Sequence, residues 1–375
     1  MAGSQYIDIF VVAVCKSGMK IICFTRSLAL GGAERQITGL ASMLSGAGHR
    51  VEVLTYRPDD FYACFLDENG VGHTCIPKRN GWQIVSDIVR HFKREKPDVV
   101  ISFLSSANLK ACRAHRRWPR FKLVVSERNV NLRYMPHDAF RFLAFREADV
   151  VVANSHTQEA FVRKHAPWLG GRLAAVVNFT DTDRFMPGKG RGNARPVICT
   201  TARVDSRKNV LGLIDAAGIL RERGLDFEVR WYGLVNGNRY YRKCIRRINA
   251  RSLSDRFFIL PAVKDVETVY GRSDIFCLPS FYEGTSNALA EALACGVPAA
   301  CSGVSDNGRY VIDGKTGFIF DPHDPESMAL ALSELLSLDS NARSAMGEAA
   351  RRTMATGLSR EAFAENYMNL LGRKD

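Results

Sequence analysis

Two carboxylates, Glu283 and Glu291, bracket a stretch with the composition of a helix start. Gly284 follows the first acid, and three residue types favoured at helix N-termini come next: Thr285, Ser286 and Asn287. Free backbone N–H groups at a helix start bind anions such as phosphate, and an acid on each side can bind hydroxyl groups. A sugar joined to a nucleoside through a diphosphate has that layout. The alternative is a polar helix cap with one acid turned to solvent.

The elements around this stretch are predicted by hydrophobic pattern. Residues 275–278 are an apolar run of the length of a buried strand, and residues 288–295 are rich in Ala and Leu. The helix is expected to stop at 296–298, which reads Gly-Val-Pro. Glu283 then lies in the loop after a strand, and Glu291 lies inside the following helix between apolar neighbours.

A second group of residues could neutralise phosphate. Arg203 and Lys208 come after a predicted strand at 197–201, and two fixed cations suit a diphosphate leaving group. The alternative is a pair of surface cations beside a turn. Gly31 and Gly32 follow a strand at 20–25 and precede a helix at 33–45, where paired glycines let a ligand approach the backbone. Their spacing is not the dinucleotide pattern G-x-G-x-x-G.

Polar residues also follow a strand predicted at 123–126. Glu127 and Asn129 lie at its carboxyl end, where open parallel sheets collect ligands. The alternative is a pair of solvated loop residues. Helices and strands alternate through the chain, as a parallel sheet requires. Further strands are expected at 51–56, 97–102, 148–156, 227–232, 257–261 and 314–320, and helices at 84–92, 210–223, 265–271, 327–338, 342–353 and 363–371.

Composition bounds the class of protein. A chain of 375 residues, 46% hydrophobic and 24% charged, is long enough for two globular domains. Its ten cysteines form no CxxC pair, which is typical of buried thiols in the cytoplasm. We find no metal-ligand cluster and no run long enough to span a bilayer. Residues 1–18 read as an appended segment, because residue 19 begins a natural chain start.

The positive charge is concentrated in the first half of the chain. Residues 1–200 hold 29 Lys and Arg against 17 Asp and Glu, whereas residues 301–350 hold 3 against 8. An anionic partner is expected, such as a membrane surface or a pyrophosphate-linked lipid. The alternative is charge that only keeps the protein in solution. Nucleic acid is disfavoured, because the aromatic residues look like core and no nucleic-acid motif appears. A basic cluster at 110–122 contains Trp118 and is either a headgroup contact or a solvated helix end.

The motif residues resemble a known family. Residues 283–291, E-G-T-S-N-A-L-A-E, are similar to the E-x7-E motif of retaining glycosyltransferases of family 4. Residues 274–280 (D-I-F-C-L-P-S), 294–299 (A-C-G-V-P-A) and 31–35 (G-G-A-E-R) resemble the same family. Where members often carry a His, this chain has S-E-R-N at 126–129, a variant of polysaccharide and glycan-assembly members.

The resemblance implies an α/β GT-B fold, in which two Rossmann-like domains with parallel sheets face a central cleft. Residues 1–185 would form an acceptor-binding domain and 186–195 a linker. Residues 196–357 would bind the nucleotide sugar, and a helix at 358–375 would cross back to the first domain.

The resemblance also implies roles. Arg203 and Lys208 would neutralise the diphosphate of the donor, a nucleoside diphosphate sugar of the UDP type, with Gly31 and Gly32 facing it. Glu283 would hold the sugar hydroxyls. Further expected contacts are Glu291 with the ribose, Val263 with the nucleobase, the amides of 284–287 with phosphate, and Glu127 or Asn129 with a sugar.

The expected reaction is transfer with retention, without metal or other cofactor, by a hexosyl- or N-acetylhexosaminyltransferase. The acceptor would be a glycan or a polyprenyl-diphosphate-linked molecule in polysaccharide or lipopolysaccharide synthesis, at the inner face of the cytoplasmic membrane. The alternatives are a nucleotide-sugar epimerase of the same fold and a non-catalytic sugar-nucleotide-binding protein.

Overall fold

The structure is a computed structural model that describes residues 18–77, 81–128, 133–188, 193–235, 237 and 239–372. Residues 1–17 of the predicted appended segment, Asn129, and linker residues 189–192 lie outside the described residues. Backbone contacts divide the chain into two compact units. Unit 1 comprises 1–125, 147–150 and 364–375, and unit 2 comprises 126–146 and 151–363.

The first sheet has seven strands in the order β3-β2-β1-β4-β5-β6-β7. They are β1 (Lys20–Phe24), β2 (Arg50–Thr55), β3 (Gly72–Cys75), β4 (Val99–Phe103), β5 (Lys122–Glu127), β6 (Val150–Ala153) and β7 (Leu173–Ala175). The described pairs β1–β2, β1–β4, β2–β3 and β6–β7 are parallel. Residues of β1 and β4 are almost all fully buried, as expected for central strands of a parallel sheet.

Helices connect these strands. They are α1 (Gly32–Gly46), α2 (Ala63–Glu68), α3 (Gly81–Glu95), α4 (Ser105–Arg117), α5 (Pro136–Ala144) and α6 (His156–His165), with the short 3-10 helices η1 (Phe145–Glu147) and η2 (Pro167–Arg172). The predicted strand 148–156 ends at Ala153 because the Ser155 side chain accepts a hydrogen bond from the Gln158 amide and begins α6. Helices α5 and α6 and the exposed strand β3 are not among the elements predicted from the sequence.

The second sheet has six strands in the order β10-β9-β8-β11-β12-β13, and every described pair is parallel. They are β8 (Val197–Thr201), β9 (Glu228–Tyr232), β10 (Phe257–Leu260), β11 (Ile275–Leu278), β12 (Ala299–Ser302) and β13 (Gly317–Phe320). The predicted strands at 197–201 and 275–278 are confirmed residue for residue. Residues 197–199 and 275–278 are continuous apolar runs, the pattern typical of buried parallel strands, and Thr200 is buried as well.

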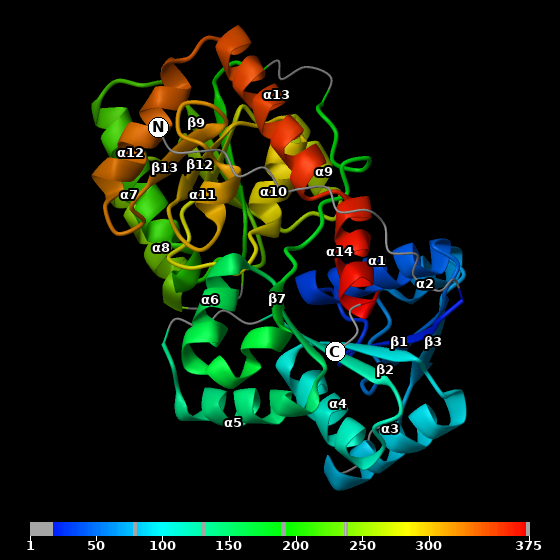
Figure 1. Cartoon of the computed structure of the whole chain (residues 1–375). Helices are drawn as coiled ribbons and strands as arrows, with labels where there is room; N and C mark the ends of the chain where they lie inside the picture. Colours follow the sequence, from blue (N-terminus) through cyan, green and yellow to red (C-terminus); the bar gives the residue numbers. More distant parts are fainter. Residues whose placement is uncertain are drawn as a thin grey trace, which may run out of the picture. The chain divides into compact units, whose positions relative to one another are not determined.

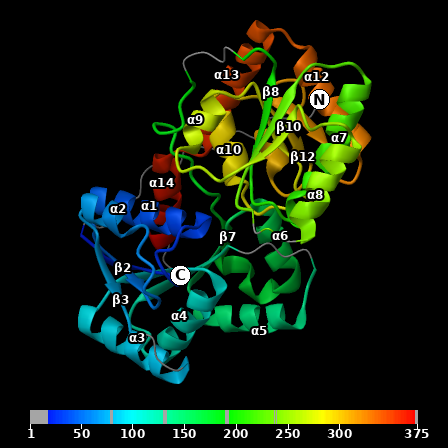
Figure 2. The same cartoon turned by 180° about the vertical axis from the view of Figure 1, so that it is seen from behind.

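Helices cover both faces of the second sheet (Figures 1 and 2). One hydrophobic cluster includes α7 (Val210–Glu222), α8 (Arg239–Ala250) and α12 (Pro325–Ser337). The other includes α9 (Val266–Gly271), α10 (Asn287–Ala294), α11 (Asn307–Tyr310) and α13 (Ser340–Gly357). Single-turn helix η3 (Ser206–Lys208) lies between β8 and α7. The expected α/β architecture with two Rossmann-like parallel sheets is confirmed.

The last helix, α14 (Arg360–Gly372), contributes residues to both units. Within unit 1 its Tyr367 ring lies 6.2 Å from the ring of Phe103, and Lys122 Nζ donates to the carbonyls of Leu370 and Leu371. The basic cluster 110–122 lies on α4 and after it, where Trp118 is half-buried against Phe121. Among the described residues, no helix combines the length and apolarity needed to cross a bilayer.

Candidate functional site

The strand order of the second sheet reverses between β8 and β11. From β8 the chain proceeds to β9 on one side, and from β11 it proceeds to β12 on the other. The loops that leave the carboxyl ends of β8 and β11 therefore open away from each other and leave room between them, which is where open α/β sheets bind ligands. These two loops carry the predicted cations and Glu283.

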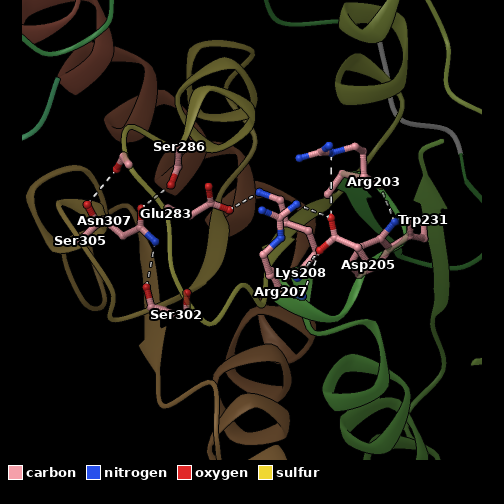
Figure 3. A network of polar contacts seen from close by, with 12 residues as sticks. Arg203, Asp205, Arg207, Lys208, Trp231, Glu283, Ser286, Ser302, Ser305 and Asn307 are labelled. Atoms are coloured by element: carbon pink, nitrogen blue, oxygen red, sulfur yellow. Dashed lines mark hydrogen bonds and ion pairs between the residues drawn. The ribbon is translucent and has the colours of Figure 1, made fainter. Parts of the chain in front are cut away.

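Asp205 organises the loop after β8 (Figure 3). Its Oδ1 accepts from the amides of Arg207 and Lys208 at 3.0 and 3.3 Å, which begins η3. Its Oδ2 lies 3.0 Å from Arg207 Nη2 and 4.0 Å from Arg203 Nε. Partial burial raises the pKa of Asp205, but the hydrogen bonds and charge of Arg207, with the charge of Arg203, outweigh it and lower the pKa below its usual value. The carboxylate therefore stays charged and holds this cationic loop together.

Lys208 connects the two loops. Its Nζ lies 2.5 Å from Glu283 Oε1, and both side chains are largely buried, with 22% and 12% exposed. The next residue, Asn209, has φ +55° and caps α7 through Oδ1, which accepts from the Gly212 amide. Asn209 Nδ2 also donates to the Pro322 carbonyl. The residue after Lys208 is therefore held both to the start of α7 and to the segment that contains Pro322. The structure thus brings together the predicted Lys208 and Glu283, whereas Arg203 remains 60% exposed.

The start of α10 is fixed by neighbouring loops. The predicted cap residue Ser286 makes no side-chain cap bond, because its hydroxyl donates to Asn307 Oδ1 at 2.7 Å. Asn307 Nδ2 in turn donates to the Ser302 carbonyl, and Ser305 Oγ donates to the Gly284 carbonyl (Figure 3). The Asn287 amide donates to the Thr285 carbonyl and is engaged in this structure. The helix tip is therefore held from outside and its first turn is not closed by its own cap.

Glu291 projects from the middle of α10 and is only 6% exposed. Its Oε2 accepts from the Tyr270 hydroxyl at 3.2 Å, and that hydroxyl is also 2.6 Å from Thr201 Oγ1 at the end of β8. Burial, with the charge of Glu291 second, raises the pKa of Tyr270 well above its usual value, so the phenol keeps its proton and donates it. Sequence reasoning missed Tyr270 because nothing in its local pattern distinguishes it from a core aromatic residue.

Two further contacts reach α10 from earlier in unit 2. Asn178 Nδ2 donates to Asn287 Oδ1 at 2.7 Å, and the Arg128 guanidinium donates to Asn178 Oδ1. The Thr285 hydroxyl donates to the Asn154 carbonyl. Arg128 belongs to the S-E-R-N stretch. The position of this stretch directly after a strand was the only sequence feature that could have indicated a role for Arg128 in the site. The stretch therefore supplies an arginine that supports the helix tip through one amide side chain.

Glu127 differs from the expectation of a sugar-facing acid. It is fully buried at the end of β5, where its Oε2 lies 2.9 Å from Arg141 Nε of α5. Arg141 Nη2 lies 2.8 Å from Asp138 Oδ1. A buried charge must be paired, and this carboxylate has a permanent partner inside the protein.

The remaining predicted residues lie at loop and helix starts. Gly31 precedes α1 and Gly32 begins it. A side chain at Gly31 would place Cβ 2.2 Å from Glu34 Oε2, so a residue other than glycine would displace that carboxylate. Burial raises the pKa of Glu34.

Val263 follows β10 and is 44% exposed, as a loop residue available to a ligand would be. These three positions stay predictions as ligand contacts.

Two family models match consecutive parts of the chain. Residues 30–184 match the model described as Glycosyltransferase Family 4, and residues 181–353 match the model described as Glycosyl transferases group 1. The chain belongs to the family 4 type of glycosyltransferase. These matches confirm the resemblance to family 4 glycosyltransferases that the motif residues indicated.

Curated relatives of this glycosyltransferase differ in substrate. A D-inositol 3-phosphate glycosyltransferase of Corynebacterium urealyticum is 30% identical over 54% of the chain and 51% of the relative, so the chain spans about half of that protein's length. A Campylobacter jejuni α-1,4-N-acetyl-D-galactosaminyltransferase that acts on an undecaprenyl-diphosphate-linked glycan is 26% identical over 87% of the chain and 90% of the relative. The lipopolysaccharide core biosynthesis glycosyltransferase LpsE of Rhizobium meliloti is 24% identical over 76% and 79%.

Solved structures share the fold. A glycosyltransferase from Rickettsia africae has a TM-score of 0.83 at 17% identity, covering 95% of this chain and all of that one. Anabaena Alr3699/HepE in complex with UDP has a TM-score of 0.83 at 17% identity, covering 94% and 99%. The fold is that of the GT-B glycosyltransferases, as predicted.

Proposed function

We propose that this glycosyltransferase transfers a hexose or N-acetylhexosamine from a UDP-sugar to a glycan or polyprenyl-diphosphate-linked acceptor, with retention of configuration and without metal. The observation that carries the proposal is the Lys208–Glu283 pair at 2.5 Å, placed where the strand order reverses and beside the tip of α10. The UDP complexes of Alr3699/HepE and the undecaprenyl-linked acceptor of the Campylobacter relative support the choice of donor and acceptor.

The residues act on the bond between the diphosphate and the sugar. Lys208 and Arg203 neutralise the negative charge that develops on the leaving diphosphate, a preorganised electrostatic stabilisation. Glu283 holds hydroxyls of the sugar, and its ion pair keeps the Lys208 ammonium in place before the donor arrives. The acceptor oxygen bonds to the anomeric carbon on the face that the diphosphate leaves, and the acceptor proton passes to a phosphate oxygen.

Nucleotide recognition uses the other acid. Glu291, oriented by Tyr270, accepts hydrogen bonds from the ribose hydroxyls, and the exposed Val263 loop meets the nucleobase. In this scheme the buried Glu127 supports α5 and does not touch a substrate, which departs from the expectation based on sequence. The setting is cell-surface polysaccharide or lipopolysaccharide synthesis, with the protein attached peripherally to the inner face of the cytoplasmic membrane.

The test begins with a thermal-shift screen of UDP- and GDP-sugars in EDTA, since a ligand that binds the folded state raises the melting temperature. The best donor is then assayed with a lipid-linked glycan acceptor. Lys208→Ala should lower kcat about 10²–10³-fold, as removal of one stabilising donor does elsewhere, and Glu291→Ala should raise KM. Lys315→Ala is the control, because Lys315 is exposed in the turn before the amino end of β13, whereas the candidate site lies at the carboxyl ends of β8 and β11.

Product stereochemistry by NMR decides the configuration. Near-full transfer by both Lys208→Ala and Glu291→Ala would contradict the assignment of the site. Turnover of donor with no acceptor present would contradict the transferase reaction, and inversion at the anomeric carbon would contradict retention.

A further inference from the structure

Helix α5 of unit 2 (green in Figure 1) exposes two of its large apolar side chains. Phe140 is 76% exposed and Leu143 is 51% exposed, and the two lie three residues apart on one face. Two charged residues of the same helix are inside, beside the buried ring of Phe142: Asp138 is fully buried and Arg141 is 7% exposed. Amphipathic helices of globular proteins normally have the reverse arrangement.

Buried charges fix this orientation. Arg141 Nε pairs with Glu127 Oε2 at 2.9 Å, and Arg141 Nη2 pairs with Asp138 Oδ1 at 2.8 Å. Asp138 Oδ2 also accepts from the Met135 amide at 2.9 Å, which holds the start of the helix. Rotation of α5 to hide Phe140 would break a paired buried charge, and an unpaired buried charge is strongly unfavourable. The apolar face is therefore held outward by the fold.

Other large apolar side chains surround this face. Met135 at the helix start is 48% exposed, and Tyr134 before it is 40% exposed, with its ring stacked on His165 at 4.6 Å. Trp168 is 42% exposed, and its Nε1 donates to the Phe142 carbonyl of α5 at 3.4 Å. We name these residues together with Phe140 and Leu143 the α5 surface. Monomeric proteins rarely expose such a cluster unless it meets a partner.

The exposed charge around the α5 surface is basic. Between residues 133 and 172, all of which are described, the exposed Lys and Arg side chains are Arg133, Arg146, Arg163, Lys164 and Arg172, of which Arg163 is paired with Glu159. The acids of this stretch are buried or half-buried. The Arg146 guanidinium lies 5.1 Å from the Trp168 ring centre, so cation and aromatic ring sit side by side. Apolar side chains ringed by Lys and Arg, with Trp and Tyr at the boundary, match an anionic lipid headgroup layer.

We propose that the α5 surface is the site at which this protein binds the surface of an anionic membrane. Phe140, Leu143 and Met135 enter the boundary between headgroups and acyl chains, while Arg146 and Lys164 contact lipid phosphates. A second copy of the chain fits less well, because a two-fold dimer would bring the same basic rim against itself. The proposal rests on the proposed function, which requires access to a lipid-linked acceptor. Membrane binding by the α5 surface can nevertheless be measured without a sugar donor.

The test is flotation of the purified full-length protein with phosphatidylcholine vesicles that contain none or about a third phosphatidylglycerol. The double variant Phe140→Ser/Leu143→Ser should lower the partition coefficient on anionic vesicles about tenfold or more, because two inserted apolar side chains are lost. Leu330→Ser is the matched control, since Leu330 is 52% exposed on α12. Arg146→Gln/Lys164→Gln should weaken binding several-fold at low salt, and the difference should shrink in high salt.

Each outcome decides the proposal. Unchanged flotation of the Phe140→Ser/Leu143→Ser variant, equal binding to neutral vesicles, or loss with Leu330→Ser would overturn it. So would a concentration-dependent dimer in the absence of lipid that the same variant dissociates. The variant should melt like the wild type and keep full transfer to a short water-soluble acceptor. If the wild type shows no transfer to that acceptor but still binds anionic vesicles, the proposed function is refuted and the membrane-binding proposal stands.

Discussion

Tyr270→Phe isolates the hydroxyl that orients Glu291. The substitution leaves the buried ring in place and removes two contacts, with Thr201 Oγ1 at 2.6 Å and Glu291 Oε2 at 3.2 Å. A neutral hydrogen bond contributes about 1 kcal/mol and one to a charged group about 1.5–3 kcal/mol. The expected loss of unfolding free energy is therefore about 2–4 kcal/mol, or a fall in melting temperature of roughly 5–15 °C for a unit of this size.

The same change should weaken recognition of the ribose. Without the Tyr270 hydroxyl, Glu291 loses the hydrogen bond at 3.2 Å that orients its Oε2, and the affinity for UDP should fall about tenfold, which corresponds to about 1.4 kcal/mol. The affinity for 2′,3′-dideoxy-UDP should barely change, because that ligand lacks the hydroxyls that Glu291 binds. The ratio of the two dissociation constants, measured by calorimetry, separates loss of recognition from a general loss of fold.

Tyr310→Phe is the matched control. Tyr310 is also buried in the hydrophobic cluster around α10. Within the part of the chain that the structure describes, its hydroxyl has no hydrogen-bond partner. This variant should melt at or above the wild-type temperature and keep the wild-type ratio. If Tyr270→Phe and Tyr310→Phe behave alike in both measurements, the role given to Tyr270 is refuted.

Two other predictions concern the loop after β8, and a third concerns metal. In a double-mutant cycle Lys208→Met and Glu283→Gln should be non-additive in kcat by a factor of about ten or more, because each leaves the other unpaired; additive effects would show that the pair is not coupled. The lowered pKa of Asp205 stabilises the fold above the usual Asp pKa of about 3.9, and this contribution is lost as pH falls through the still lower folded pKa. The difference in unfolding free energy between wild type and Asp205→Asn should therefore shrink when the pH is lowered from 5 towards 3; a constant difference would contradict the assignment. EDTA should leave the transfer rate unchanged. A loss of rate in EDTA that added Mg²⁺ restores would contradict metal independence.

Local patterns in the sequence determined the scaffold of the site. The apolar runs at 197–199 and 275–278 belong to buried strands, because a parallel strand covered on both faces does not alternate apolar and polar residues. The glycine at 296 ends α10, where it adopts a φ of +68°. A parallel sheet then requires loops after β8 and β11 to share one edge. Lys208 and Glu283 were therefore predictable as members of one site.

Only the tertiary structure decided which residues support that site and which side chains face outward. Tyr270, Asn178 and Asn307 contact the start or middle of α10 from distant parts of the chain, and no local signal marks them. Glu127 looked like a loop acid, yet it is fully buried because Arg141, in a helix that was not predicted, neutralises it. Local propensity depends on a residue and its neighbours, whereas the burial of a charge depends on the partner that folding brings to it.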